Sequence, residues 1–127
     1  MVLKWFRAEG ELLVEEARAI EVAYRAGELI IMAPCLLRLE VVNVAGRRWR
    51  LDEAELLDLS REVDALRFQY IEPELDLVAR WTARGLTSYD ASYVALAEEQ
   101  SVRLITDDHL ILSTAAAIAF PLAGSDG

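Results

Sequence analysis

Short apolar runs that alternate with longer amphipathic segments constrain this chain more than any other feature. Residues 29–33, 68–71, 102–106 and 119–122 have the length and the apolar character of short buried strands. Apolar residues recur at helical spacing in the segments between them, which predicts helices over about 11–26, 35–45, 52–66, 74–84, 87–98 and 110–117. Strands separated by helices predict an α/β domain with a mostly parallel sheet.

Length and composition limit the classes of protein to consider. The 127 residues predict one domain, 1–127. A net charge of −9 argues against a uniformly basic surface that coats nucleic acid, but not against a nuclease that holds the backbone through metal ions. The single cysteine, Cys35, excludes an internal disulfide, and we expect it to be a small buried hydrophobe in a cytoplasmic protein. The longest apolar run, 29–37, is too short to span a bilayer, so no membrane association is expected.

The segment 87–98 combines a helix start with an acid that the helix does not obviously need. Thr87 is a candidate N-cap, and Asp90 follows three residues later. The residues behind them are almost all small or apolar, which predicts a buried helix. An acid on the first turn of a buried helix requires a positive partner or a metal ion to stabilise its charge. The alternative is that Asp90 only completes the helix cap.

Two further acids lie where an apolar or structural residue would be simpler. Glu40 interrupts a helix that is apolar on nearly every side, and Asp108 follows the carboxyl end of a predicted strand. Sites in open α/β sheets assemble beyond the carboxyl ends of strands. Each acid also has an ordinary interpretation. Glu40 could pair with Arg38 or Arg47, and Asp108 or its neighbour Asp107 could cap the next helix.

If these carboxylates gather, a cation must neutralise them. Hard oxygen ligands suit Mg²⁺ or Mn²⁺, which also bind a substrate phosphate. The chemistry then available is hydrolysis of a phosphodiester by a water that the metal activates.

Several segments in combination resemble the PIN-domain proteins, specifically the VapC-type toxins. The segments are Leu3-Lys-Trp-Phe6, Ala33-Pro-Cys-Leu-Leu-Arg-Leu-Glu40-Val-Val-Asn43-Val, Leu86-Thr-Ser-Tyr-Asp90-Ala-Ser-Tyr-Val-Ala-Leu-Ala97 and Leu104-Ile-Thr-Asp-Asp108. The resemblance covers almost the whole chain. It implies a three-layer α/β/α fold and Mg²⁺- or Mn²⁺-dependent cleavage of single-stranded RNA. It also implies a cognate antitoxin protein and frequent homodimerisation.

The resemblance also assigns roles to individual residues. Glu40, Asp90 and Asp108 match the family's metal-binding and catalytic acids, and Thr106 matches its site threonine. Asp107 and Asn43 are expected to lie around these ligands.

One departure from the family concerns the start of the chain. Family members begin with an apolar strand that ends in an aspartate, whereas this sequence starts at Met1-Val2, just before Leu3. The resemblance therefore implies that a central strand is missing, with one metal-binding aspartate, which leaves two inner strand edges unpaired. We interpret this as a misplaced start, the alternative being a degenerate family member.

Two functions follow from these observations. The first is a metal-dependent endoribonuclease, the toxin of a toxin–antitoxin pair. The second is a non-catalytic PIN-like module that binds an antitoxin helix in an apolar groove. A phospho-receiver domain, which also pairs acids near a sheet edge, is set aside because it needs a late lysine, and the only lysine here is Lys4.

Overall fold

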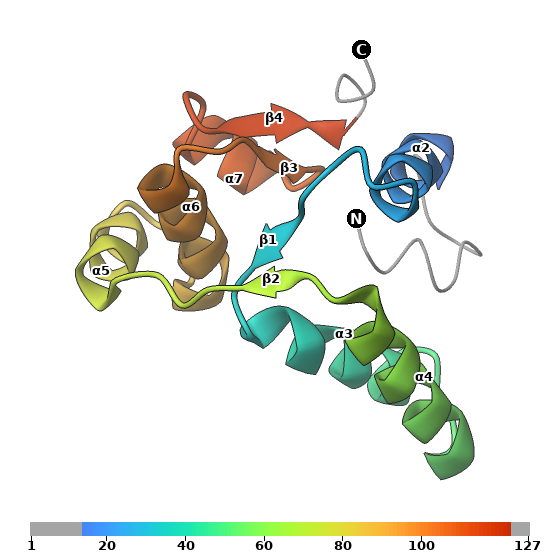
Figure 1. Ribbon diagram of the computed structural model, residues 1–127. Helices are drawn as coiled ribbons and strands as arrows, with labels where there is room; N and C mark the ends of the chain where they lie inside the picture. The colour runs from blue at the N-terminus through green and yellow to red at the C-terminus, as the bar shows by residue number, and fades with distance from the viewer. Residues whose placement is uncertain (1–13, 123–127) are drawn as a thin grey trace.

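The computed structural model describes residues 14–122, which alternate between helices and short strands. The strands are β1 (Met32–Ala33), β2 (Gln69–Tyr70), β3 (Leu104–Thr106) and β4 (Ala119–Pro121). The helices are α2 (Val14–Arg25), α3 (Leu36–Arg47), α4 (Glu53–Leu66), α5 (Leu75–Ala83), α6 (Ser88–Gln100) and α7 (His109–Thr114). Figure 1 shows α5 and α6 together on one side of the strands and α3 with α4 below them. The predicted α/β class is confirmed.

The strands form two separate pairs and not one continuous sheet. β1 pairs with β2 in parallel, with Met32 opposite Gln69, and β3 pairs with β4 in parallel, with Leu104 opposite Ala119. Parallel pairing is therefore confirmed for every pair. Within residues 14–122, no strand pairs with the second edge of β1 or of β3.

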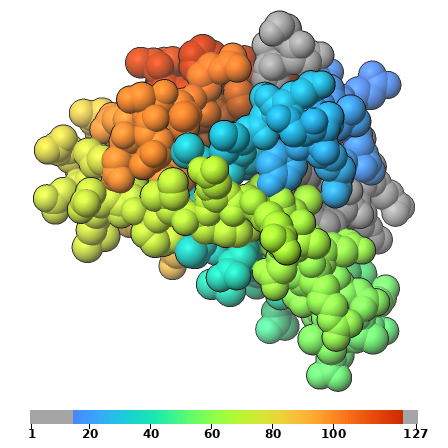
Figure 2. Space-filling view, viewed as in Figure 1, coloured from blue at the N-terminus to red at the C-terminus, as the bar shows by residue number. Residues whose placement is uncertain are grey.

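Several of the predicted elements are shorter than expected, most of all the first strand and the last helix. The run 29–33 contributes only Met32–Ala33 to a strand, and Leu29 and Ile30 before it are 43% and 71% exposed. Figure 2 shows the segment that precedes and includes β1, coloured blue to cyan, at the surface of the molecule. In the described part of the chain, no neighbouring strand lies beside them to extend the pairing. The last helix ends at Thr114 and not at residue 117, because the amides of Ile118 and Ala119 turn back to the carbonyl of Ala115.

The buried residues form two hydrophobic clusters. The first core comprises Ala17, Val41, Ala45, Leu59, Val63, Leu66, Phe68 and Leu122. The second core comprises Val78, Trp81, Leu86, Ala91, Val94, Ala95, Ile111, Ala115 and Ala119. Helices α2, α3 and α4 therefore pack around the first core, and α5, α6 and α7 pack around the second.

The prediction for Cys35 is wrong. Its side chain is half-buried, and its backbone N–H donates to the Glu72 carboxylate over 2.8 Å at the start of α3. Cys35 thus occupies a polar helix start and not a core position. None of the helices within residues 14–122 is long and apolar enough to cross a membrane.

Candidate metal and catalytic site

Helix α6 fixes Asp90 on its first turn. Thr87 is the N-cap, with extended backbone angles (φ −63°, ψ 155°), and its Oγ1 accepts a hydrogen bond from the Asp90 amide over 3.1 Å. The following turns bury Ala91, Val94 and Ala95 in the second core, so the helix is buried as predicted. The predicted cap is therefore real. It uses the Asp90 backbone amide, and the Asp90 carboxylate in turn interacts with the Thr87 side chain.

Asp108 begins α7, directly after β3. Its Oδ1 accepts a hydrogen bond from the Ile111 amide over 2.9 Å, which makes it the N-cap of the helix. The Asp108 amide donates in turn to Oγ1 of Thr106 over 3.1 Å. The ordinary interpretation of Asp108 as a cap is confirmed. A carboxylate has two oxygens, and in the described part of the chain no hydrogen bond is made to Oδ2, so capping does not exclude a role as a ligand.

Glu40 lies on α3, and its partner is a tyrosine of α6. The Tyr93 hydroxyl donates to Oε1 of Glu40 over 2.7 Å, although 53 positions separate the two residues in the sequence. Neither expected arginine partner holds Glu40. Arg38 instead pairs with Asp64 over 3.6 Å. Sequence analysis did not identify Tyr93 as a site residue, and the one available signal was its place one helical turn beyond Asp90.

The charges of the acids affect one another's pKa values. Partial burial raises the pKa of Asp90, the charge of Asp108 raises it further, and a hydrogen bond from Thr87 opposes this shift. Partial burial also raises the pKa of Glu40, and the charge of Asp90 adds to it against the hydrogen bond from Tyr93. Burial and the Glu40 carboxylate raise the pKa of Tyr93, so this hydroxyl remains a hydrogen-bond donor.

The three carboxylates do not form a preformed cage. Within residues 14–122, no group of three or more His, Cys, Asp and Glu side chains is arranged to hold a metal ion. The expectation that Glu40, Asp90 and Asp108 meet around one ion stays a prediction. Their roles as metal ligands stay predictions.

The chemistry of the donor set nevertheless fits a hard divalent cation. All three groups offer carboxylate oxygens, the ligand type that Mg²⁺ and Mn²⁺ prefer. Among the described residues, no arginine, lysine or histidine forms an ion pair with Glu40, Asp90 or Asp108. The negative charge in this region therefore lacks a protein counter-charge within that part of the chain.

The remaining predicted site residues lie on the same elements. Thr106 ends β3 and contacts Asp108 as described above. Asp107 is exposed between β3 and α7, and Asn43 is exposed on α3, one turn after Glu40. Their places around the acids stay predictions.

We expect Glu40→Gln to stabilise the metal-free protein at neutral pH. A carboxyl whose pKa is raised by folding contributes stability below its unfolded pKa of about 4.3, and this stability is lost as the pH rises through the folded pKa. Glutamine mimics the protonated form and avoids that loss. Because Glu40 is exposed overall, the gain is at most about 1 kcal/mol.

The measurement is the melting temperature in EDTA between pH 3 and pH 8. The variant should melt above the wild type at pH 7, and the difference should vanish below about pH 4. Glu62→Gln, at an exposed position on α4, is the control and should leave the melting temperature unchanged. A variant that melts at or below the wild-type temperature at pH 7 would contradict this account.

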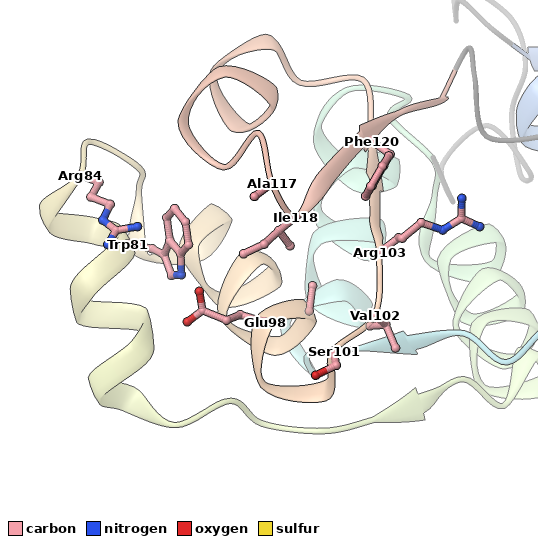
Figure 3. A pocket seen from close by; sticks show the side chains of 10 residues that line it. Trp81, Arg84, Glu98, Ser101, Val102, Arg103, Ala117, Ile118 and Phe120 are labelled. Carbon is pink, nitrogen blue, oxygen red and sulfur yellow. The ribbon is translucent and has the colours of Figure 1, made fainter.

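A surface groove lies at the other end of α6 (Figure 3). Its walls include two stacked pairs: the Arg84 guanidinium lies 4.4 Å from the Trp81 ring centroid, and that of Arg103 lies 5.7 Å from the centroid of Phe120. Ser101, which also lines the groove, is eleven residues beyond Asp90, or about 16 Å along a helix. The groove has no acid cluster, so we place the chemistry at the carboxylates.

Comparison with known proteins assigns this architecture to a family. The PIN domain matches residues 2–118, and the chain therefore belongs to the PIN-domain family. It is similar to PAE2754 from Pyrobaculum aerophilum in its crystal structure, with 28% sequence identity and a TM-score of 0.62 over 85% of this chain and 82% of that one. A search of curated proteins gave no match. PIN domains are typically metal-dependent nucleases, so the family makes a nuclease the expected activity.

Proposed function

We propose that this protein is a Mg²⁺- or Mn²⁺-dependent endoribonuclease that cleaves single-stranded RNA, and that it is the toxin of a toxin–antitoxin pair. One observation carries the proposal. The charge of Asp90 raises the pKa of Glu40, and the charge of Asp108 raises the pKa of Asp90. No arginine, lysine or histidine of residues 14–122 forms an ion pair with any of these three acids. Membership of the PIN-domain family, whose members are typically metal-dependent nucleases, supports the interpretation of these acids as metal ligands.

Each acid has a defined task in this proposal. The charge of Asp90 acts on Glu40 and the charge of Asp108 acts on Asp90, and in the proposal each of the three would hold the cation through a carboxylate oxygen. Tyr93 and the Ile111 amide each occupy one oxygen, of Glu40 and of Asp108 respectively, and thereby limit the rotation of these two carboxylates. A bound Mg²⁺ or Mn²⁺ supplies Lewis-acid chemistry, because it neutralises phosphate charge and makes a water molecule a better nucleophile.

The net charge of −9 makes the cation necessary for a second reason. RNA is a polyanion, and an acidic surface repels it. The cation reverses the sign of the local potential at the carboxylates, so that a phosphate can approach there. We expect binding of RNA to be weak when the cation is removed.

The test is cleavage of a 5′-labelled single-stranded RNA by this chain and by a form extended at its amino terminus by the upstream in-frame codons. Cleavage in Mg²⁺ or Mn²⁺ that EDTA abolishes, with the matched RNA duplex left intact, supports the proposal. If both forms leave the single strand uncut in every condition, the enzyme assignment is wrong.

A second function has its own supporting observation. The acids do not form a ready metal cage in the described residues, and the Asp108 carboxylate already caps α7. Both facts favour a non-catalytic PIN-like module that binds an antitoxin. The alternative is supported if a purified antitoxin, taken from the adjacent gene, binds with equal affinity in Mg²⁺ and in EDTA while RNA stays uncut. We also propose a homodimer, which light scattering would test.

A further inference from the structure

Tyr93 joins the two halves of the molecule at the acids. Its helix, α6, packs in the second core through Val94 and Ala95, whereas the α3 helix of Glu40 packs in the first core through Val41 and Ala45. The hydrogen bond from the Tyr93 hydroxyl to Oε1 of Glu40 crosses from one helix to the other. It therefore fixes Glu40 relative to the helix that carries Asp90.

The chemical nature of this partner matters. An arginine at the same place would neutralise Glu40 and remove the charge that attracts a cation. A tyrosine hydroxyl donates one hydrogen bond and carries no charge, so the carboxylate keeps its full negative charge. Oε2 accepts no hydrogen bond from the described residues, and this oxygen remains for a ligand.

Tyr93 also shares a face of α6 with Asp90. Residues three apart on a helix are neighbours. The side chain that orients Glu40 is therefore built on the same rigid element as the central acid. Because Ala91 and Val94 beside it are fully buried, α6 cannot shift without disturbing the second core.

We propose that Tyr93 is a positioning residue of the cation site, which orients the Glu40 carboxylate toward Asp90 and so sets the affinity for the divalent cation. This inference rests on the proposed function only for the existence of a cation site. Groups that hold a metal ligand in place typically change metal affinity by about 10- to 100-fold when removed. The effect acts through Glu40, since Tyr93 itself is not placed as a ligand.

The experiment compares Mn²⁺ affinity by calorimetric titration for the wild type and Tyr93→Phe, without RNA. Phenylalanine keeps the ring and removes only the hydroxyl. We expect affinity to fall about 10- to 100-fold, with RNA cleavage recovering at saturating Mn²⁺. In a Glu40→Gln background, Tyr93→Phe should have little further effect on Mn²⁺ affinity, because the carboxylate through which Tyr93 acts is already absent.

Tyr24→Phe is the matched control. The Tyr24 hydroxyl donates to the Leu66 carbonyl and links α2 to the end of α4, so its loss is purely structural. It should lower the melting temperature and leave Mn²⁺ affinity unchanged. If Tyr93→Phe behaves in the same way, the positioning role is overturned. A wild type that binds Mn²⁺ but does not cut RNA contradicts the proposed function alone, whereas a wild type that binds no Mn²⁺ contradicts both.

Discussion

Asp90→Asn should lower the rate of Mg²⁺-dependent cleavage of single-stranded RNA by at least about a hundredfold. Loss of a group that only supports a metal ligand costs up to about a hundredfold in metal affinity or activity, and loss of the ligand itself should cost at least as much. Among these three acids, Asp90 raises the pKa of Glu40 through its charge, and its own pKa is raised by the charge of Asp108. Asparagine keeps the shape and the amide that donates to Thr87, so the start of α6 should persist. Only the negative charge is lost.

Two measurements separate a site effect from a folding effect. The cleavage rate should fall, whereas the melting temperature in EDTA should stay level or rise, because one like charge has been removed. Glu98→Gln is the matched control, since Glu98 is an exposed acid at the far end of the same helix. A variant of Asp90 that cuts RNA at the wild-type rate would remove it from the site.

Trp81→Ala should give the largest loss of stability, about 3–5 kcal/mol. The Trp81 side chain is only 5% exposed and belongs to the second core, between α5 and α6. Its ring also carries the stacked Arg84 guanidinium. The alanine variant therefore loses the apolar area, leaves a cavity and frees the arginine. A domain of this size has a total stability of about 5–15 kcal/mol, so the variant would be close to unfolding.

Urea denaturation followed by circular dichroism checks this value. Leu75→Ala is the control on the same helix, because Leu75 is 77% exposed and its truncation should change the free energy of unfolding by less than about 0.5 kcal/mol. A Trp81 variant that unfolds at the same urea midpoint as the wild type would show that the second core does not depend on this ring.

Local signals in the sequence were sufficient for the helix starts. Asp52 and Glu55 form a capping box at the start of α4, the helix predicted over 52–66, with both reciprocal hydrogen bonds present. Thr87 caps α6 as predicted. These interactions span only three residues, so spacing alone identifies them. The glycine at position 27 also follows the last turns of α2 with a positive φ of 78°, which suits a helix end.

Long-range features were not accessible in the same way. The residues 29–31 have the composition of a strand, but a strand also needs a partner on its edge, and composition does not reveal one. The Tyr93–Glu40 hydrogen bond depends on how α3 and α6 are placed, which no local pattern encodes. Asp108 shows a third case. Its sequence position suits both a cap and a ligand, and the structure confirms only the cap.

The separation into two cores has a consequence for how the molecule would respond to a cation. Glu40 projects from a helix anchored in one core, while Asp90 and Asp108 begin helices anchored in the other. An ion shared by all three would tie together two bodies that are otherwise packed around different centres. Its arrival would then stiffen the whole protein and not just a few side chains, and it would add to the Tyr93–Glu40 hydrogen bond that already links the two halves.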